Sequence, residues 1–124
     1  MNGKLLLDTN AVIALLEGNA TVENLCAKAT WIGISVITEL EFLSFDSLSA
    51  SDVALFEEFK KRVEVISVNQ SNITLLQMTI DLRRTYNVKL PDAIIAASAI
   101  INKANLVSND AFFGRVTSLK TLTF

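Results

Sequence analysis

A short apolar run, Leu5 to Leu7, ends at the carboxylate of Asp8 and passes at once into a helical pattern. Such a run is typical of a strand that is buried on both faces of a sheet. Thr9 and Asn10 follow as candidate helix caps, ahead of apolar residues at helical spacing. Asp8 is therefore predicted at the carboxyl end of a parallel strand, which is where open α/β sheets bind their ligands.

The remainder of the chain alternates between strand and helix patterns. Further strands are predicted over residues 31–35, 63–68, 105–108 and 119–124. Helices are predicted after residue 10, over residues 21–29, after residue 35, over residues 51–62, 69–86 and 93–102, and from residue 111. This alternation predicts one α/β domain over residues 1–124, a three-layer sandwich with a mostly parallel central sheet of four to five strands.

The predicted helix over residues 69–86 carries apolar side chains on two sides. One stripe holds Ile73, Leu76 and Ile80, and the nearly opposite stripe holds Leu75, Met78, Leu82 and Tyr86. A helix that is apolar on two sides has two packing partners. One is expected to be the sheet, and the other is a neighbouring helix or a second subunit. We expect the stripe through Leu75 to be covered in a homodimer.

The composition narrows the chemistry that is open to this chain. It has no His, which excludes His-based catalytic triads and the usual His-rich zinc sites. Cys26 is the only cysteine, so an internal disulfide is excluded, and the residue is expected to pack as a small hydrophobe. Acid–base or metal chemistry must therefore use carboxylates.

Two features favour a soluble cytoplasmic protein without a membrane partner. The longest uncharged apolar run, residues 93–101, has about half the length that a bilayer requires. The residues ahead of the Asp8 strand are too few for a signal peptide.

The net charge of −2 is unusual for a protein that binds nucleic acid, but the basic residues are clustered. One cluster covers residues 60–62, and another holds Arg83 and Arg84 with Lys89 nearby. Either cluster can be a solvated helix end, where cations suit the helix dipole, or a phosphate contact.

Carboxylates recur where the predicted strands end. Asp8 follows the first strand, Glu39 lies one helical turn after the second, and Asp110 follows the strand over residues 105–108. Asp92 opens an apolar helix directly after Pro91. In a parallel sheet these four acids share one edge, where they repel one another unless a cation lies among them. Hard oxygen ligands favour Mg²⁺ or Mn²⁺, which activate water and neutralise charge on a phosphoryl group in transit.

Other roles for these residues stay open. Asp8 and Asp110 could serve only as helix caps, Asp92 could serve only the helix dipole, and Glu39 could be a solvated helix residue. Glu39 and Glu41 lie about 200° apart on a helix, so only one of them can join the cluster, and Glu39 is the one assigned. The flanking polar residues could orient ligands or water, or could cap helices; they are Thr9, Asn10, Ser108 and Asn109.

Four motifs in order resemble PIN-domain ribonucleases, and most closely the VapC-type toxins of type II toxin–antitoxin pairs. They are Leu-Leu-Leu-Asp8-Thr-Asn10, Ser35-Val-Ile-Thr-Glu39-Leu, Leu90-Pro-Asp92-Ala-Ile-Ile-Ala-Ala and Leu106-Val-Ser-Asn-Asp110-Ala-Phe-Phe. Together they span essentially the whole chain. Ser108 stands where the family usually has Thr and keeps the hydroxyl, whereas Phe112 stands where the family often has a further acid.

The resemblance implies an endoribonuclease that cuts RNA with Mg²⁺ or Mn²⁺. By resemblance, the catalytic and metal-binding acids are Asp8, Glu39, Asp92 and Asp110. Metal-activated water would be the nucleophile, with Asp8 or Asp92 taking its proton. The family also forms homodimers and is silenced by a small antitoxin that covers the active-site groove. The apolar segment over residues 40–48 is a candidate for that contact, with core packing as the alternative.

Two other functions are compatible with a fold of this class. A phosphoacceptor receiver domain needs paired acids after its first strand and a Lys after a late strand, and this chain has the single Asp8 and then Ser108-Asn109 at those places. The sequence therefore argues against a receiver. A non-catalytic PIN-like module that binds RNA or protein would carry the same acids, and only activity separates it from an enzyme.

Overall fold

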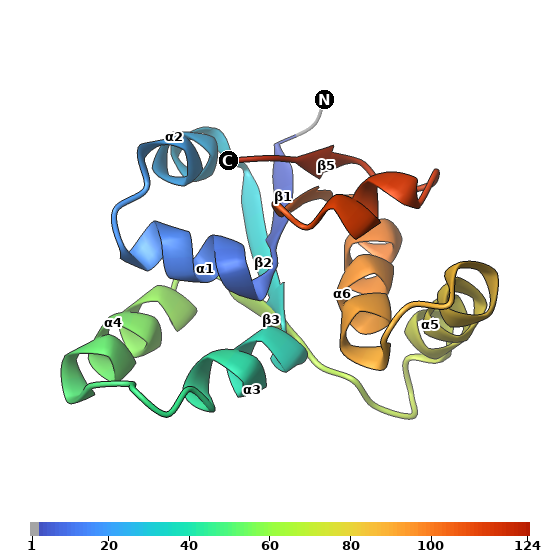
Figure 1. Ribbon diagram of the computed structural model, residues 1–124, viewed down its shortest axis with the longest axis horizontal. Helices are drawn as coiled ribbons and strands as arrows, with labels where there is room; N and C mark the ends of the chain where they lie inside the picture. Colours follow the sequence, from blue (N-terminus) through green and yellow to red (C-terminus); the bar gives the residue numbers. More distant parts are fainter. Residues whose placement is uncertain (1–2) are drawn as a thin grey trace.

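The central sheet has five parallel strands in the computed structural model, which describes residues 3–124. The strands are β1 (Lys4–Leu7), β2 (Trp31–Ser35), β3 (Glu64–Ile66), β4 (Asn105–Val107) and β5 (Thr121–Leu122). Their order is β3-β2-β1-β4-β5, and each pairing is parallel (Figure 1). The predicted three-layer α/β fold with a mostly parallel sheet is confirmed.

The leucines of β1 explain why the sheet is buried on both faces. Leu6 belongs to one hydrophobic core, whereas Leu5 and Leu7 belong to the other, because successive side chains of a strand point to opposite faces. All three are buried. The sheet therefore separates two cores, and β1 with its terminal Asp8 lies in the middle of the sheet.

Helices cover both faces of the sheet (Figure 1). On one side lie α1 (Thr9–Leu16), α2 (Ala20–Lys28), α3 (Val36–Leu43) and α4 (Ala50–Lys60). On the other side lie α6 (Leu90–Ile101) and, packed against it, α5 (Ile73–Tyr86). A 3₁₀ helix, η1 (Ala111–Arg115), follows β4.

Polar side chains set the helix starts. Asp8 itself caps α1 by accepting a hydrogen bond from Ala11 N at 2.8 Å, so the prediction of a cap at Thr9 or Asn10 is wrong. Ser35 caps α3 as predicted, accepting from Ile37 N.

Two helix starts differ from the prediction. Helix α5 begins at Ile73 rather than near residue 69, because Asn69 forms a turn with Ser71 and Asn72 is the cap. Ser49 begins α4 through a capping box with Asp52, slightly ahead of the predicted start at residue 51.

The two apolar stripes of α5 have different environments. Leu75 and Leu82 are buried, and Met78 and Tyr86 pack against the same core. This stripe is covered by α6 within the chain, so the prediction that it is covered in a homodimer is wrong. Ile73 and Ile80, on the other stripe, are 72% and 47% exposed.

Within residues 3–124, every helix falls short of the length and hydropathy that a membrane span requires. Cys26, on α2, is half-buried and packs against the core that holds Leu5 and Leu7, as expected of a small hydrophobe.

Candidate functional site

A cleft of about 630 Å³ lies at the carboxyl edge of the sheet, with α1 and α3 on one side and α6 and η1 on the other. Four carboxylates line it, from Asp8, Glu41, Asp92 and Asp110. The remaining lining residues are Thr9, Asn10, Ile37, Leu40, Ser44, Phe45, Pro91, Ile95 and Phe113. The structure therefore brings three of the four predicted acids together and adds a different fourth.

Asp8 is buried at the end of β1. Burial raises the pKa of Asp8 above its ordinary value, because a desolvated carboxylate is less stable than the neutral acid. Hydrogen bonds from Ser108 and Ala11 oppose this shift, and the nearby charges of Asp110 and Glu41 add to it. Asp8 is both a helix cap and a cleft residue, so these two predicted roles are compatible.

Ser108 connects two of the acids. Its hydroxyl hydrogen-bonds the Asp8 carboxylate and accepts a hydrogen bond from Asp110 N at 3.0 Å. Asp110 in turn caps η1, because Oδ1 accepts from Phe112 N at 3.0 Å. The buried hydroxyl therefore holds the end of β4 in register with the end of β1.

Asp92 lies in the first turn of α6, directly after Pro91. Burial raises the pKa of Asp92, and the charges of Asp110 and Glu41 raise it further, whereas Lys89 acts in the opposite direction. Like charges that affect one another in this way lie close together. Asp92 therefore belongs to the same electrostatic cluster as the other acids of the cleft.

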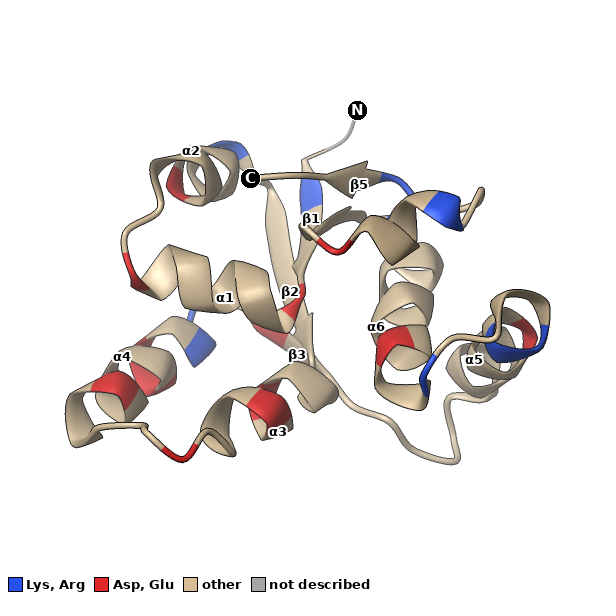
Figure 2. Ribbon diagram, viewed as in Figure 1, with Lys and Arg blue, Asp and Glu red and all other residues tan. Residues whose placement is uncertain are grey.

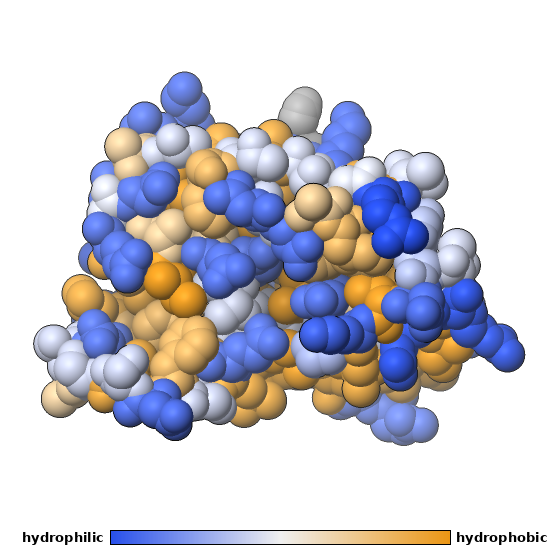
Figure 3. All heavy atoms as spheres, in the orientation of Figure 1, coloured by the Kyte–Doolittle hydropathy of each residue, from blue (hydrophilic) through white to orange (hydrophobic). Residues whose placement is uncertain are grey.

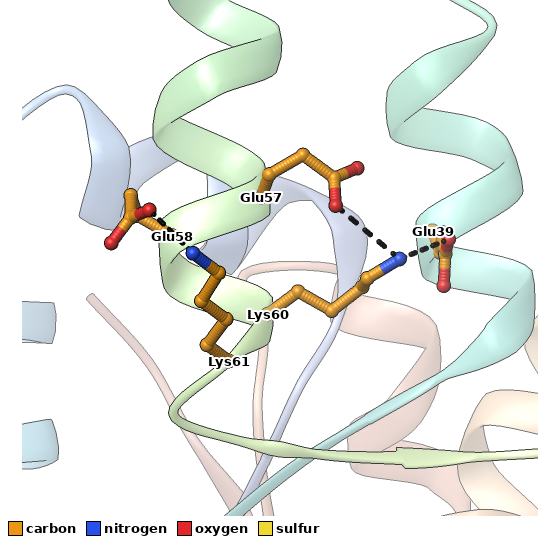
Figure 4. Close-up of polar contacts among 5 residues, drawn as sticks. All are labelled: Glu39, Glu57, Glu58, Lys60 and Lys61. Carbon is orange, nitrogen blue, oxygen red and sulfur yellow. Dashed lines mark hydrogen bonds and ion pairs between the residues drawn. The ribbon is translucent and has the colours of Figure 1, made fainter.

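Glu39 lies outside the cleft, contrary to its predicted place. Lys60 Nζ, from the end of α4, donates to Glu39 Oε2 at 3.0 Å and also lies 3.5 Å from Glu57 Oε1 (Figure 4). Glu39 thus points from α3 toward α4. The sequence placed one of two glutamates in the cluster but could not decide how α3 is rotated about its axis.

Glu41 takes the position in the cleft. It shares a side of α3 with Ile37 and Ser44, which also line the cleft and recur at helical spacing. The Thr9 hydroxyl donates to Glu41 Oε1 at 2.5 Å, linking α1 to α3. The buried Thr38 hydroxyl lies 3.4 Å from the Thr9 hydroxyl. The single proton of Thr9 goes to Glu41, so Thr38 is the donor to Thr9.

The other predicted supporting residues divide into two groups. Thr9 and Asn10 line the cleft, and Ser108 lies buried beneath it. Asn109 has a different role, because its amide group donates to Phe124 O at 2.6 Å and accepts from Phe124 N at 2.8 Å. It secures the C-terminal segment beside β4.

The donor set of the cleft fits a hard divalent cation, since carboxylate oxygens are the ligands that Mg²⁺ and Mn²⁺ prefer. The raised pKa values of Asp8 and Asp92 reflect burial and repulsion by the neighbouring carboxylates, and a bound cation would reduce this repulsion. Within residues 3–124, no three acidic or Cys side chains converge closely enough to ligate one ion directly. Mg²⁺ usually keeps several waters, so ligation partly through water suits this spacing.

One wall of the cleft is apolar and exposed. Leu40 is 58% exposed and Phe45 is 43% exposed, and Leu43 lies between them in the chain. Figure 3 shows orange apolar surface over α3 and α4 beside the blue polar residues of the cleft. An exposed apolar patch beside a polar site marks a contact surface.

A family model described as PIN domain matches residues 5–119. The fold is similar to that of a toxin–antitoxin complex from Klebsiella pneumoniae, with 25% identity, a TM-score of 0.78 and coverage of 96% of both chains. It is also similar to DNA-bound VapBC from Salmonella typhimurium, with 26% identity, a TM-score of 0.75 and coverage of 99% of this chain and 98% of that one. VapBC from nontypeable Haemophilus influenzae shares the fold at 21% identity, with a TM-score of 0.79 and 96% of both chains covered. No curated protein matches the chain.

Proposed function

The chain belongs to the PIN-domain family, and on that premise we propose that it is a metal-dependent endoribonuclease and the toxin of a toxin–antitoxin pair. The observation that carries the proposal is the convergence of Asp8, Glu41, Asp92 and Asp110 on one cleft. These four residues come from separate parts of the chain. The fold brings their carboxylates, which repel one another, to one edge of the sheet.

In this proposal the four cleft carboxylates hold Mg²⁺ or Mn²⁺ partly through bound water, with Glu41 in the place first assigned to Glu39. When bound, such an ion lowers the pKa of water and neutralises charge on a phosphoryl group. Asp8 or Asp92 accepts the proton of the attacking water, a role for which a raised pKa is suited. Ser108 and Thr9 hold Asp8 and Glu41 in place.

A small antitoxin is the proposed protein partner. The similar structure from Klebsiella pneumoniae is described as a toxin–antitoxin complex, and its identity to this chain is 25%. Leu40, Leu43 and Phe45 form an exposed apolar patch next to the acids. A segment bound over this patch would also cover the cleft, so one contact would block access of RNA.

We further propose that residues 1–124 form a single PIN-like domain that acts in the cytoplasm as a homodimer. The exposed stripe of α5 at Ile73 and Ile80 supports an interface there, because the opposite stripe is already buried against α6.

The test is cleavage of a single-stranded RNA by the purified chain. Cleavage is expected with Mg²⁺ or Mn²⁺, none is expected in EDTA, and Asp8→Asn is expected to abolish it. RNA binding without cleavage under any of these conditions would instead indicate a non-catalytic module. Expression of the wild-type chain alone is expected to arrest growth, and Asp8→Asn is expected to relieve the arrest.

A further inference from the structure

The charges of this chain are divided unequally between the two sides of the cleft. Residues 1–64 hold ten Asp and Glu and five Lys and Arg, whereas residues 65–124 hold three Asp and six Lys and Arg. Two of those three aspartates, Asp92 and Asp110, belong to the cleft. Figure 2 shows the result: red residues predominate over α3 and α4, and blue residues lie over α5, the α5–α6 connection and η1.

The structure distinguishes the two basic clusters of the sequence. In the first cluster, Lys60 is paired with Glu39 and Glu57, and Lys61 with Glu58 at 2.9 Å (Figure 4). Acids on the same side of the molecule therefore neutralise these lysines. On the other side, and within the part of the chain that the structure describes, Lys89 of the second cluster and Arg115 of η1 form no ion pair with a carboxylate.

Arg115 lies beside a group of aromatic rings that begins in the cleft, and Lys89 follows one of these aromatic residues, Tyr86, by three positions in the chain. Phe113 lines the cleft, and the Phe112 ring lies 5.3 Å from it, measured between centroids. The Phe112 ring also meets Tyr86 edge-on at 6.5 Å, and the Arg115 guanidinium lies 5.7 Å from its centroid. Lys89 is the N-cap residue of α6 and acts electrostatically on Asp92.

We propose that Tyr86, Lys89, Phe112 and Arg115, here called the aromatic–basic rim, bind the single-stranded RNA segment next to the scissile phosphate. Lys89 and Arg115 contact phosphates, and an unpaired base stacks on the Phe112–Arg115 pair. Aromatic rings and guanidinium planes both serve as stacking surfaces for unpaired bases. This proposal rests on the proposed function and assigns the substrate path to one side of the cleft.

Position 112 is where this chain departs from the family pattern, because an aromatic residue stands where a further acid is common. The exchange removes a negative charge from the rim and adds a stacking surface. The opposite wall is apolar at Leu40 and Phe45, and acidic residues predominate over α3 and α4 (Figure 2). Residues 1–64 hold five more acids than bases, so we expect the phosphate backbone to lie along the rim and a protein partner to contact the apolar wall.

The experiment measures binding of a 12-nucleotide fluorescein-labelled RNA by fluorescence anisotropy, with Ca²⁺ present and the RNA checked for integrity on a gel. The rim variant is Lys89→Ala with Arg115→Ala. The matched control is Lys61→Ala with Arg62→Ala, which removes the same charge from the other side. We expect the rim variant to raise Kd about tenfold or more and to reduce the slope of log K against log salt by about 1.4, as for two lost phosphate contacts. We expect the control to change Kd less than about twofold.

A second pair of variants tests the stacking surface. Phe112→Leu retains apolar packing and is expected to raise Kd about fivefold with an unchanged salt slope, whereas Phe112→Tyr should bind as wild type does. Circular dichroism and thermal melting test whether each variant folds. If Phe112→Leu does not fold, the variants of the exposed residues Lys89 and Arg115 still test whether the rim binds RNA.

Equal weakening by the rim and control variants would overturn the assignment, while cleavage by the wild type that Asp8→Asn abolishes would leave the proposed function standing. If the rim variant bound RNA as the wild type does but had an altered sedimentation coefficient, the rim would be a protein contact. That result would also overturn the assignment of the rim to RNA. Absence of both RNA binding and cleavage in the wild type would overturn both proposals.

Discussion

The hydroxyl of Thr9 donates a 2.5 Å hydrogen bond to Glu41 Oε1 across the gap between α1 and α3. Thr9 follows Asp8 directly, so the same turn of chain carries one acid of the cleft and positions another. The hydroxyl of Thr38 lies 3.4 Å from the hydroxyl of Thr9 and helps to fix its position. The position of Glu41 thus depends on a side chain that is not itself an acid.

Replacing Thr9 by Val should weaken binding of Mn²⁺ about tenfold, because groups that orient metal ligands typically contribute that much or more. Thr9→Ser keeps the donor and should bind Mn²⁺ nearly as wild type does. Titration calorimetry on the RNA-free protein measures both constants. Equal affinities for Thr9→Val and Thr9→Ser would show that the hydroxyl has no positioning role.

The two glutamates of α3 should differ sharply in their effect on RNA cleavage. Glu41→Gln should lower the rate by more than about 100-fold, since it removes a charge from the cleft itself. Glu39→Gln serves as the matched control, because it makes the same chemical change on the same helix but faces Lys60. We expect it to retain most of the activity. The reverse order of the two rates would restore the original assignment of Glu39.

The metal-free protein should lose stability as the pH rises. The pKa values of Asp8 and Asp92 are raised in the folded chain, which therefore retains protons that the unfolded chain has released. The free energy of unfolding then falls as the pH rises from about 4 through the folded pKa values. Urea denaturation in EDTA measures this dependence.

Asp8→Asn should make that pH dependence shallower and should raise stability at pH 7 in EDTA, because it removes one crowded charge. Adding Mg²⁺ should stabilise the wild type at pH 7, since a ligand that binds only the folded state shifts the equilibrium toward it. The Asn variant should respond much less. A wild-type stability that rises with pH in EDTA would contradict the inferred crowding.

The apolar wall of the cleft should be needed for neutralisation by the proposed antitoxin. Leu40→Asp should weaken binding by about 2 kcal/mol, or roughly thirtyfold, as expected for a central apolar anchor. Val53→Asp, at an exposed position on α4 outside the cleft, is the control. Co-purification and growth rescue measure the effect. Rescue of Leu40→Asp at wild-type levels would place the antitoxin elsewhere.

The proposed homodimer should depend on the exposed stripe of α5. Ile73→Asp combined with Ile80→Asp should give a monomer in sedimentation at micromolar concentration, because charges at the centre of an apolar interface oppose its burial. Lys103→Asp, at an exposed turn after α6, should leave the dimer intact. A wild-type chain that sediments as a monomer would remove the interface altogether.

Much of the architecture could be predicted from local patterns. The three leucines before Asp8 are buried on both faces of the sheet, Ser35 caps the next helix, and Pro91 opens the helix that presents Asp92. Each of these features depends on residues that are close in the chain. Helix caps, buried strands and helix starts can therefore be predicted from the local sequence.

The two apolar stripes of α5 show what the local sequence pattern could not predict. The pattern showed correctly that two sides are apolar but could not say which one α6 covers. Residues 69–72 were predicted as the first turn of this helix, yet Asn69 accepts a hydrogen bond from Ser71 N and Asn72 accepts one from Leu75 N, which delays the start of α5. Such competition between a turn and a helix is decided by small energy differences that a pattern does not contain.

By itself, the sequence determined that carboxylates gather at one edge of a parallel sheet, because the ends of parallel strands meet there whatever their separation in the chain. Only the tertiary structure decided between Glu39 and Glu41. The ring of Phe42 stacks on Phe56 at 4.7 Å and Thr38 is fully buried, which sets the rotation of α3. With that face turned inward, Glu41 points to the cleft and Glu39 to Lys60, because side chains two residues apart on a helix face nearly opposite ways.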